Sequence, residues 1–490
     1  MSVVTTDRYQ TTVGLEIHVE LSTRSKMFCG CSVAFGGAPN TRTCPVCLGL
    51  PGSLPVVNAS ALEYAVKIAV ALNCEIAGHS LFHRKNYFYP DIPKNYQISQ
   101  YDLPLGSRGF LEIQGASGPV RVGITRVHLE EDTGKSSHVG GTGRIADSEY
   151  SLEDFNRAGT PLVEIVTEPD LHSAEDSRIF VAELRALLES LGVSDVRMEE
   201  GSLRVDANIS VRYAGEAEHG TKVEIKNMNS IRSVGRALEY EERRQREALK
   251  SGETLLQETR HFDEKAGTTS PLRSKEYAFD YRYFPEPDLV PFEPAEEWIA
   301  GLRDSLPESP ALRRERFAAT YGLRERDIAV LTTSSATARW FERAAAAYEG
   351  DAKKVVNWII ADLFGLLNEA GIQLQEVPFP PSHLASLVTL VDRGKISGKQ
   401  AKLVLEEMFR TGQAPDAIAA AKGLEQISDE GAVEATVDEV IAENPDAADK
   451  VRAGQLNTVG FLVGQVMKKS RGKANPGMVN DLLRKKLTRG

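Results

Sequence analysis

The sequence predicts an α+β protein in which a mixed or largely antiparallel sheet comes first and helices follow. Apolar and polar residues alternate along several segments up to about residue 230, which is typical of half-buried strands. From residue 295 to about 410 the apolar spacing is helical, and a proline-rich break over 281–291 precedes it. Because 490 residues exceed one ordinary core, we expect domains over 1–294, 295–412 and 413–490.

The composition is that of a soluble globular protein, and we expect a cytoplasmic location with no membrane partner. The first residues lack a basic region followed by an apolar run, and no apolar stretch reaches the ~18 residues that a membrane-spanning helix requires. The formal net charge of -11 argues against indiscriminate nucleic-acid binding, although it allows a local basic surface.

Three strand-like segments, 13–21, 126–135 and 203–209, carry polar faces that combine carboxylates with basic side chains. Taken alone, each face is typical of an antiparallel strand with one side in water. Taken together, they offer the carboxylates and imidazoles that suit Mg²⁺ or Mn²⁺, and such an ion commonly also holds nucleotide phosphates. The residues on these faces are Glu16, His18 and Glu20, then Arg126, His128, Glu130 and Asp132, and finally Arg204, Asp206 and Asn208.

Four of the five cysteines form two close pairs, Cys29-x-Cys31 and Cys44-x-x-Cys47. In a chain without an export signal, two such pairs separated by a short loop indicate a tetrahedral zinc site rather than disulfides. A redox pair at Cys44 and Cys47 is the alternative, but the flanking βαβ pattern that this chemistry needs is absent from the sequence. The fifth, Cys74, is expected to be a buried small apolar residue.

Charge is concentrated in two further parts of the chain. The stretch 84–100 interleaves basic residues with four aromatic residues and two prolines, so it either contacts nucleic acid or a nucleotide, or packs its rings under the sheet. The C-terminal region is asymmetric, because 424–449 contains nine acids and no Lys or Arg, whereas 466–490 contains eight bases and one acid. This contrast predicts a local basic surface on an acidic protein.

A set of longer motifs is spread over the first 290 residues: Gly14–Leu21, Leu54–Asn58, His128–Asp132, Asp154–Arg157, Gly159–Glu164 and Glu200–Arg204. Together they resemble the B subunit of the tRNA-dependent amidotransferase GatCAB, and the likeness runs from about residue 11 to the C-terminus. The resemblance implies an enzyme that converts Glu-tRNA(Gln) to Gln-tRNA(Gln), and often Asp-tRNA(Asn) to Asn-tRNA(Asn), using ATP and ammonia drawn from glutamine.

The resemblance also implies an organisation and a set of partners. A cradle domain with a kinase-like site comes first, followed by a helical domain and a tail related to the YqeY proteins, and these last two bind the tRNA. An amidase-type A subunit and a small C subunit are the expected partners in a heterotrimer. Zinc is expected to support the structure near the site and not to perform the chemistry.

Protein groups in such a site mainly position the reactants and balance charge during phosphoryl transfer. The residues assigned to magnesium are Glu16, His18, Glu130 and Asp206, with Glu131, Asp132 and Glu164 as alternatives. The residues assigned to phosphate charge are Lys135, Arg204 and Lys226. The residues assigned to tRNA binding are Lys468, Lys469, Arg471, Lys473, Arg484, Lys485 and Lys486.

Two other classes of protein remain as alternatives. A non-catalytic, zinc-containing tRNA-binding protein is the first, although pure binding does not need strands of alternating acids and histidines. A stand-alone aminoacyl-tRNA synthetase is the second, and the sequence contains neither a His-Ile-Gly-His nor a Lys-Met-Ser-Lys-Ser run.

Overall fold

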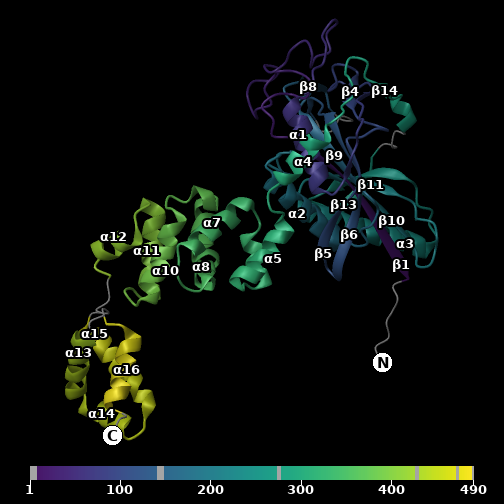
Figure 1. Ribbon diagram of the computed structural model, residues 1–490. Helices are drawn as coiled ribbons and strands as arrows, with labels where there is room; N and C mark the ends of the chain where they lie inside the picture. The colour runs from purple at the N-terminus through teal and green to yellow at the C-terminus, as the bar shows by residue number, and fades with distance from the viewer. Residues whose placement is uncertain (1–7, 141–147, 273–277, 425–429, 471–473, 488–490) are drawn as a thin grey trace. The chain divides into compact units, whose positions relative to one another are not determined.

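The computed structural model describes residues 8–140, 148–272, 278–424, 430–470 and 474–487. The chain forms two compact units, one up to Pro310 and one from Ala311 onwards (Figure 1). The division into three domains at residues 294 and 412 stays a prediction. Among the described residues, no helix is long and apolar enough to cross a membrane.

A nine-stranded sheet forms the centre of the first unit. Its strand order is β13-β12-β11-β10-β1-β9-β6-β5-β2, in which β11 and β12 run parallel and the other neighbours run antiparallel. The predicted α+β class with a mixed, largely antiparallel sheet is therefore confirmed. The strands are β1 (Tyr9–Glu20), β2 (Glu75–Ile76), β5 (Gly106–Gly115), β6 (Gly118–Glu131), β9 (Pro161–Thr167), β10 (Leu203–Tyr213), β11 (Val223–Met228), β12 (Glu258–Asp263) and β13 (Thr268–Pro271).

The helices α1 (Ala59–Ala71), α2 (Ala174–Leu191) and α3 (Ile231–Ser251) pack on the apolar side of this sheet. Strand β1 shows the reason, because Leu15 and Ile17 are fully buried in the core whereas the alternating polar residues face the other way. The helix α4 (Glu296–Asp304) contacts α1, and its Leu302 joins the same core. One face of the sheet is thus covered by helices, and the other face carries charge.

Two smaller sheets complete the first unit. The segment 84–100, in which the sequence indicates only an irregular run, contributes to an antiparallel pair that β14 extends. The second sheet is a ribbon of two strands. The strands are β3 (His83–Asn86), β4 (Tyr96–Ser99) and β14 (Phe284–Pro285) in the first, and β7 (Lys135–Val139) and β8 (Tyr150–Asp154) in the second; a short 3-10 helix, η2 (Ala278–Tyr281), precedes β14.

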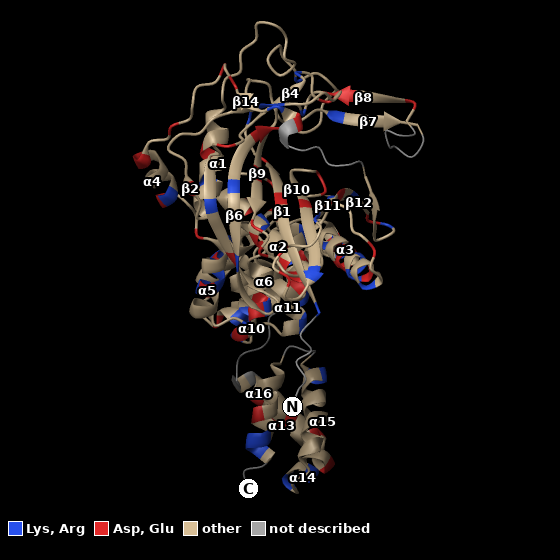
Figure 2. Cartoon of the chain, turned by 90° about the vertical axis from the view of Figure 1, so that its right-hand side faces the viewer, with Lys and Arg blue, Asp and Glu red and all other residues tan. Residues whose placement is uncertain are grey.

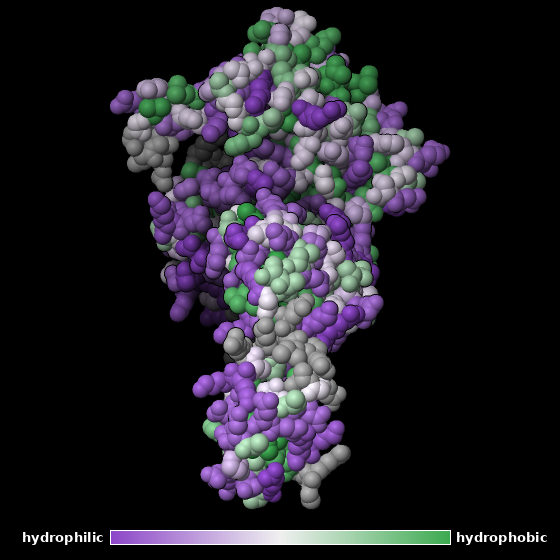
Figure 3. Space-filling view, turned by 90° about the vertical axis from the view of Figure 1, so that its left-hand side faces the viewer, coloured by the Kyte–Doolittle hydropathy of each residue, from purple (hydrophilic) through white to green (hydrophobic). Residues whose placement is uncertain are grey.

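The second unit is helical and has two separate hydrophobic cores. The first core includes Trp340 and Phe341, and the second includes Leu462 and Leu483. The face of the helices around the second core that is seen in Figure 3 is mostly hydrophilic. The helices around the first core are α5 (Pro310–Tyr321), α6 (Glu325–Leu331), α7 (Ser335–Ala346), α8 (Ala352–Trp358), η3 (Ile359–Leu363), α9 (Phe364–Ala370), η4 (Leu374–Glu376), α10 (Pro381–Asp392), α11 (Gly398–Thr411) and α12 (Pro415–Ala421), and those around the second are α13 (Glu430–Glu443), α14 (Pro445–Arg452), η5 (Leu456–Thr458), α15 (Val459–Lys469) and α16 (Pro476–Leu487).

Gly109 in β5 tests the packing of the hydrophobic core of the first unit. Cys74 is buried, as predicted, and a Cβ at Gly109 would lie 2.4 Å from its Sγ and 2.5 Å from the carbonyl oxygen of Leu72. Gly109→Ala should therefore lower the free energy of unfolding by about 1–3 kcal/mol through overpacking. Gly301→Ala in α4 is the matched control, because nothing lies within 4 Å of its Cβ position. It should be neutral or slightly stabilising, and equal losses in calorimetric unfolding of both variants would contradict this account.

Candidate active site

Acids and histidines from β1, β6 and β9 meet on the polar face of the central sheet. The strand register places Glu164 opposite His18 on one side and opposite His128 on the other. Glu164 Oε2 lies 3.7 Å from His18 Nε2 and 3.1 Å from His128 Nε2. Glu130 Oε1 lies 3.4 Å from the same His18 nitrogen. One ligand atom each from His18, Glu130 and Glu164 falls within 4.8 Å of the others, so the three could share one cation.

The electrostatics of this group favour the ionised form of Glu164. Burial alone would raise the pKa of Glu164, but the charges of His128 and His18 outweigh it and hold that pKa well below its usual value. Lys85 of β3 also interacts with this group. Burial would lower the pKa of Lys85, but the charge of Glu130 opposes it, and the pKa lies above its usual value. Figure 2 shows acidic residues along β1, β9 and β10, which form the middle of this face.

The other two predicted magnesium ligands form a neighbouring pair. Glu16 and Asp206 lie opposite one another in the β1–β10 register. Asn208 Nδ2 donates a hydrogen bond of 2.9 Å to Glu16 Oε1, and Lys226 Nζ lies 2.6 Å from Asp206 Oδ2. Among the described residues, the buried Oδ1 atom of Asn208 has no hydrogen-bond partner, so Asn208 still offers an oxygen beside this pair for a ligand. Of the four predicted magnesium ligands, His18 and Glu130 therefore contact one another, whereas Glu16 and Asp206 have other partners.

A second charged group lies where β1 and β6 end and β10 begins. Arg204 Nη2 lies 2.7 Å from Asp132 Oδ2, and Arg157 Nε lies 3.5 Å from the same oxygen. Burial would raise the pKa of Asp132, but the two guanidinium groups outweigh it and hold the pKa below its usual value. Burial, and after it the charge of Asp132, raises the pKa of Glu20 to about 8. Glu20 thus holds a proton at neutral pH beside an ionised carboxylate.

Two further predicted residues of the first unit, Glu131 and Lys135, lie apart from the polar face. Glu131 forms an ion pair with Lys94 and accepts a hydrogen bond of 2.9 Å from the backbone nitrogen of Ile98, so its carboxylate is engaged on the other side of β6. Lys135 is exposed at the start of β7 in the two-stranded ribbon. The other two predicted phosphate-binding cations lie on the polar face, where each already pairs with an acid.

The four paired cysteines converge between β1 and α1. The Sγ atoms of all four lie within 4.8 Å of one another, and none of the four forms a disulfide. A hydrogen bond from Cys29 lowers the pKa of Cys47 to about 4, and the backbone nitrogen of Cys44 donates to the Cys47 sulfur at 3.2 Å. Because a tetrahedron with Zn–S bonds of ~2.3 Å has sulfur–sulfur separations of ~3.8 Å, the donor set and spacing fit zinc.

Two basic residues of the tail lie against acidic helix α13. Lys469 Nζ is 2.8 Å and 2.5 Å from two carboxylates, and Lys486 Nζ is 2.7 Å from two others. The acids are Glu439 and Glu443 for Lys469, and Glu434 and Asp438 for Lys486. The acidic and basic stretches of the sequence are therefore partly paired with one another.

The rest of the predicted tRNA-binding set divides in two. Lys468, Arg484 and Lys485 are exposed on α15 and α16. Arg471 and Lys473 lie outside the described residues.

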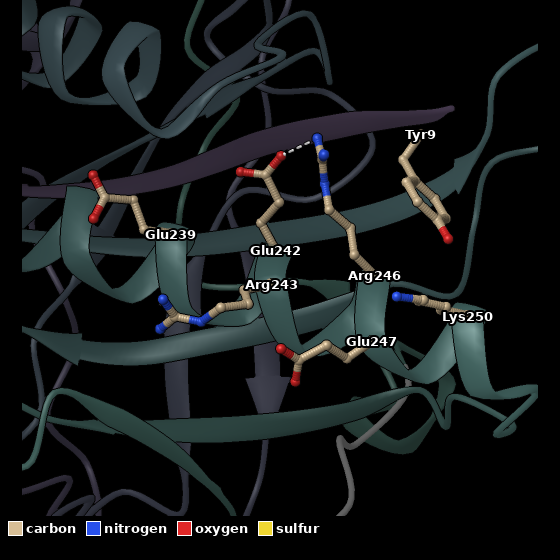
Figure 4. A pocket seen from close by; sticks show the side chains of 7 residues that line it. All are labelled: Tyr9, Glu239, Glu242, Arg243, Arg246, Glu247 and Lys250. Atoms are coloured by element: carbon tan, nitrogen blue, oxygen red, sulfur yellow. Dashed lines mark hydrogen bonds and ion pairs between the residues drawn. The ribbon is translucent and has the colours of Figure 1, made fainter. Parts of the chain in front are cut away.

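An open hollow of about 370 Å³ lies on helix α3 beside Tyr9 (Figure 4). Glu242 and Arg246 form an ion pair of 2.7 Å across one helical turn there, and the lining alternates acids with bases. Such alternation stabilises a long helix in water. The lining contains no histidine and no group of converging carboxylates, so we place the candidate site on the sheet.

Several residues of the site escape the sequence-based assignment. Glu20 alternates with the assigned residues of the same strand, so the period of two could have identified it. Arg157 lies in one of the family motifs, which is a weaker signal. Lys85 and Lys94 belong to the basic and aromatic stretch, and only the fold reveals that they reach the acids of β6.

The raised pKa of Glu20 predicts a pH dependence of stability. Between the ordinary value of 4.5 and about 8, the native state keeps a proton that the unfolded chain has released, so the free energy of unfolding should fall as pH rises. Glu20→Gln cannot titrate and should reduce this fall. Denaturant unfolding from about pH 5 to about pH 9 measures it. Glu239→Gln, an exposed acid of α3, should keep the wild-type slope, and an unchanged slope in Glu20→Gln would refute the assignment.

Two regions of the chain match known protein families. Residues 11–300 match the GatB/GatE catalytic domain, which includes every strand and acid of the polar face described above. Residues 339–487 match the GatB domain, which includes the α13–α16 bundle.

Curated proteins match over nearly the whole length. The B subunit of the aspartyl/glutamyl-tRNA(Asn/Gln) amidotransferase from Carboxydothermus hydrogenoformans is 52% identical over 481 residues, covering 98% of this chain and 99% of that protein. The protein of the same name from Moorella thermoacetica is 53% identical over 479 residues, covering 98% and 100%. That of Persephonella marina is 50% identical over 479 residues, covering 98% and 99%. The chain therefore belongs to the family of aspartyl/glutamyl-tRNA(Asn/Gln) amidotransferase B subunits.

Proposed function

We propose that the chain activates the side-chain carboxylate of Glu-tRNA(Gln), Asp-tRNA(Asn) or both with ATP and converts it to the amide with ammonia from glutamine. The observation that carries this proposal is the group formed by His18, Glu130 and Glu164 on the polar face of the region that matches the GatB/GatE catalytic domain. The alternative, a non-catalytic zinc-containing tRNA-binding protein, gives no reason for such a group.

The chemistry requires activation because a carboxylate has no leaving group at neutral pH. Transfer of the γ-phosphoryl group of ATP to a carboxylate oxygen gives an acyl phosphate and ADP. Attack of ammonia on the carbonyl carbon then forms the C–N bond, and phosphate leaves with that oxygen. Both steps gather negative charge, so the protein must hold the reacting groups in line and supply positive charge.

The polar face offers groups for each task. We assign His18 and Glu130 to Mg²⁺ with Glu164 beside them, and Glu16 and Asp206 as the neighbouring carboxylates. Bound magnesium neutralises the phosphate oxygens of ATP.

Positive side chains complete the site. Arg204 and Lys226 are held against Asp132 and Asp206, which fixes their charges on the polar face where phosphate would lie. Lys135 is the third assigned cation, in the ribbon β7–β8.

Ammonia is expected to come from a partner. Four of the five cysteines converge on one cluster and Cys74 is buried, so none is placed as an accessible nucleophile for glutamine hydrolysis. We propose an amidase-type A subunit and a small C subunit as the partners, in agreement with the names of the relatives, which are those of one subunit of a larger enzyme. We also propose that the cysteine cluster holds a structural Zn²⁺.

The acid–histidine group can be tested by isosteric substitution. Glu130→Gln and Asp206→Asn should each lower tRNA-dependent ATP hydrolysis by about a hundredfold or more, because each removes a negative charge from the proposed magnesium site. Misacylated tRNA and ATP are supplied to the full complex, and phosphate release is measured. Glu112→Gln, an exposed acid of β5, is the matched control and should retain wild-type turnover. If both site variants retain it too, the proposed site is wrong.

The proposed tRNA binding by the tail is tested by substituting charged residues. Truncation is unsuitable because α15 and α16 supply part of the hydrophobic core of the tail. Replacing Lys468, Arg484 and Lys485 by Gln should weaken tRNA binding and make its salt dependence shallower, because fewer counterions are released. Each lost phosphate contact should reduce the slope of log K against log salt by roughly 0.7–0.9. Filter binding at several salt concentrations measures both. Unchanged affinity and slope would move the tRNA site away from these residues.

A further inference from the structure

Lys26 is a buried lysine that the proposed mechanism does not use. It is 1% exposed and is among the largest fully buried side chains of the protein. Its Nζ lies 3.6 Å from Cys47 Sγ and donates a hydrogen bond of 3.0 Å to the carbonyl oxygen of Phe155. In the part of the chain that the structure describes, no carboxylate oxygen lies within ion-pair distance of this nitrogen.

A buried ammonium in this position needs a counter-charge. The carbonyl oxygen of Phe155 accepts a hydrogen bond but does not cancel this charge, and an uncompensated buried charge is strongly unfavourable. Glu131 of β6 is committed to Lys94, so the counter-charge must come from the sulfur of Cys47. Four thiolates around one zinc ion would carry two net negative charges, and one of these sulfurs, that of Cys47, lies directly against Lys26.

The backbone fixes Lys26 in this place. Its amide nitrogen donates to the carbonyl oxygen of Cys31 at 2.9 Å, and the next amide, of Met27, donates to Gly159 at 2.7 Å. A Cβ at Gly159 would lie 3.4 Å from Lys26 Cδ and 3.7 Å from Cys47 Cβ, so the chain closes over both side chains. The lysine therefore cannot reach water by a change of rotamer alone.

We propose that Lys26 is the charge-balancing partner of the tetracysteine site and that its N–H···S hydrogen bond to Cys47 sets the affinity for Zn²⁺. This inference rests on the zinc part of the proposed function. Through the carbonyl oxygen of Phe155, the same ammonium also holds the loop that carries Arg157 to Asp132. Lys26 is thus a positioning residue that links the metal cluster to the polar face.

The first measurement is the zinc affinity of the full-length chain, by competition with a chromophoric chelator. Lys26→Met keeps the apolar stem and removes the charge and the donor, and it should weaken zinc binding by about 10–100-fold, as is usual for residues that support metal ligands. Lys67→Met is the matched control, since Lys67 is a part-buried lysine of α1 paired with Glu63. It should leave the affinity unchanged.

The second measurement separates charge balance from simple packing. With zinc bound, Lys26→Met should melt at a lower temperature than the wild type. After zinc is removed by chelation, the loss in melting temperature should be smaller, because the ammonium then faces the single charge of Cys47 and not the larger negative charge of a zinc–tetrathiolate cluster. A side chain that matters only by its volume would lower both melting temperatures equally.

The outcomes separate the two proposals. A wild-type chain that binds no zinc would overturn both the zinc site and the role of Lys26. A wild-type chain that binds zinc, with Lys26→Met binding it equally well or losing stability equally in both forms, would overturn the role of Lys26 alone. If Lys26→Met does not fold, Lys26→Gln, which removes the charge but keeps a donor, provides the same comparison and should show the same smaller loss after zinc removal.

Discussion

Charge neutralisation within the buried polar face is the constraint on which the rest of the first unit depends. Glu164 lies between two imidazoles, and Asp132 lies between two guanidinium groups. Removing one member of such a pair leaves a buried charge without compensation, which is more costly than never having built the pair. The charged groups of the polar face are therefore already held by partners before any ligand arrives. A site that handles triphosphate and carboxylate groups benefits from that, because little reorganisation remains when the reactants bind.

Local pattern predicts part of this arrangement. The period of two along β1, β6 and β10 identifies the polar faces, and the spacing of the cysteines identifies their cluster. Sequence-local signals do not encode the strand order, in which β9 comes between β1 and β6 and brings Glu164 between two histidines. The sequence alone does not identify Lys85 and Lys26 as parts of these sites, because their partners lie far along the chain. In the tail, the charge runs are visible in the sequence, but the pairing of α13 with α15 and α16 requires the fold.

The metal cluster and the polar face share a short piece of backbone. Gly159 accepts from the amide of Met27 beside the cysteines, and its own amide donates to the carbonyl oxygen of Asp132 at 2.8 Å. Its φ of +87° suits glycine, and its Cβ position faces Cys47 and Glu131 at 3.7 Å each. One residue therefore contacts both the cysteine loops and the strand end that carries the acids. A structural metal bound to the cysteines would support the geometry of the site without touching the reactants.

The ion pairs between α13 and the basic residues of the tail have a consequence for release. Lys469 and Lys486 are already surrounded by carboxylates, so a polyanion that binds them must exchange one set of anions for another. Exposed ion pairs of this kind are weak, and the exchange is nearly balanced in energy. If the tail binds tRNA as proposed, the acidic helix is in place to take the lysines back as each phosphate leaves, and this exchange of anions would speed release of the product.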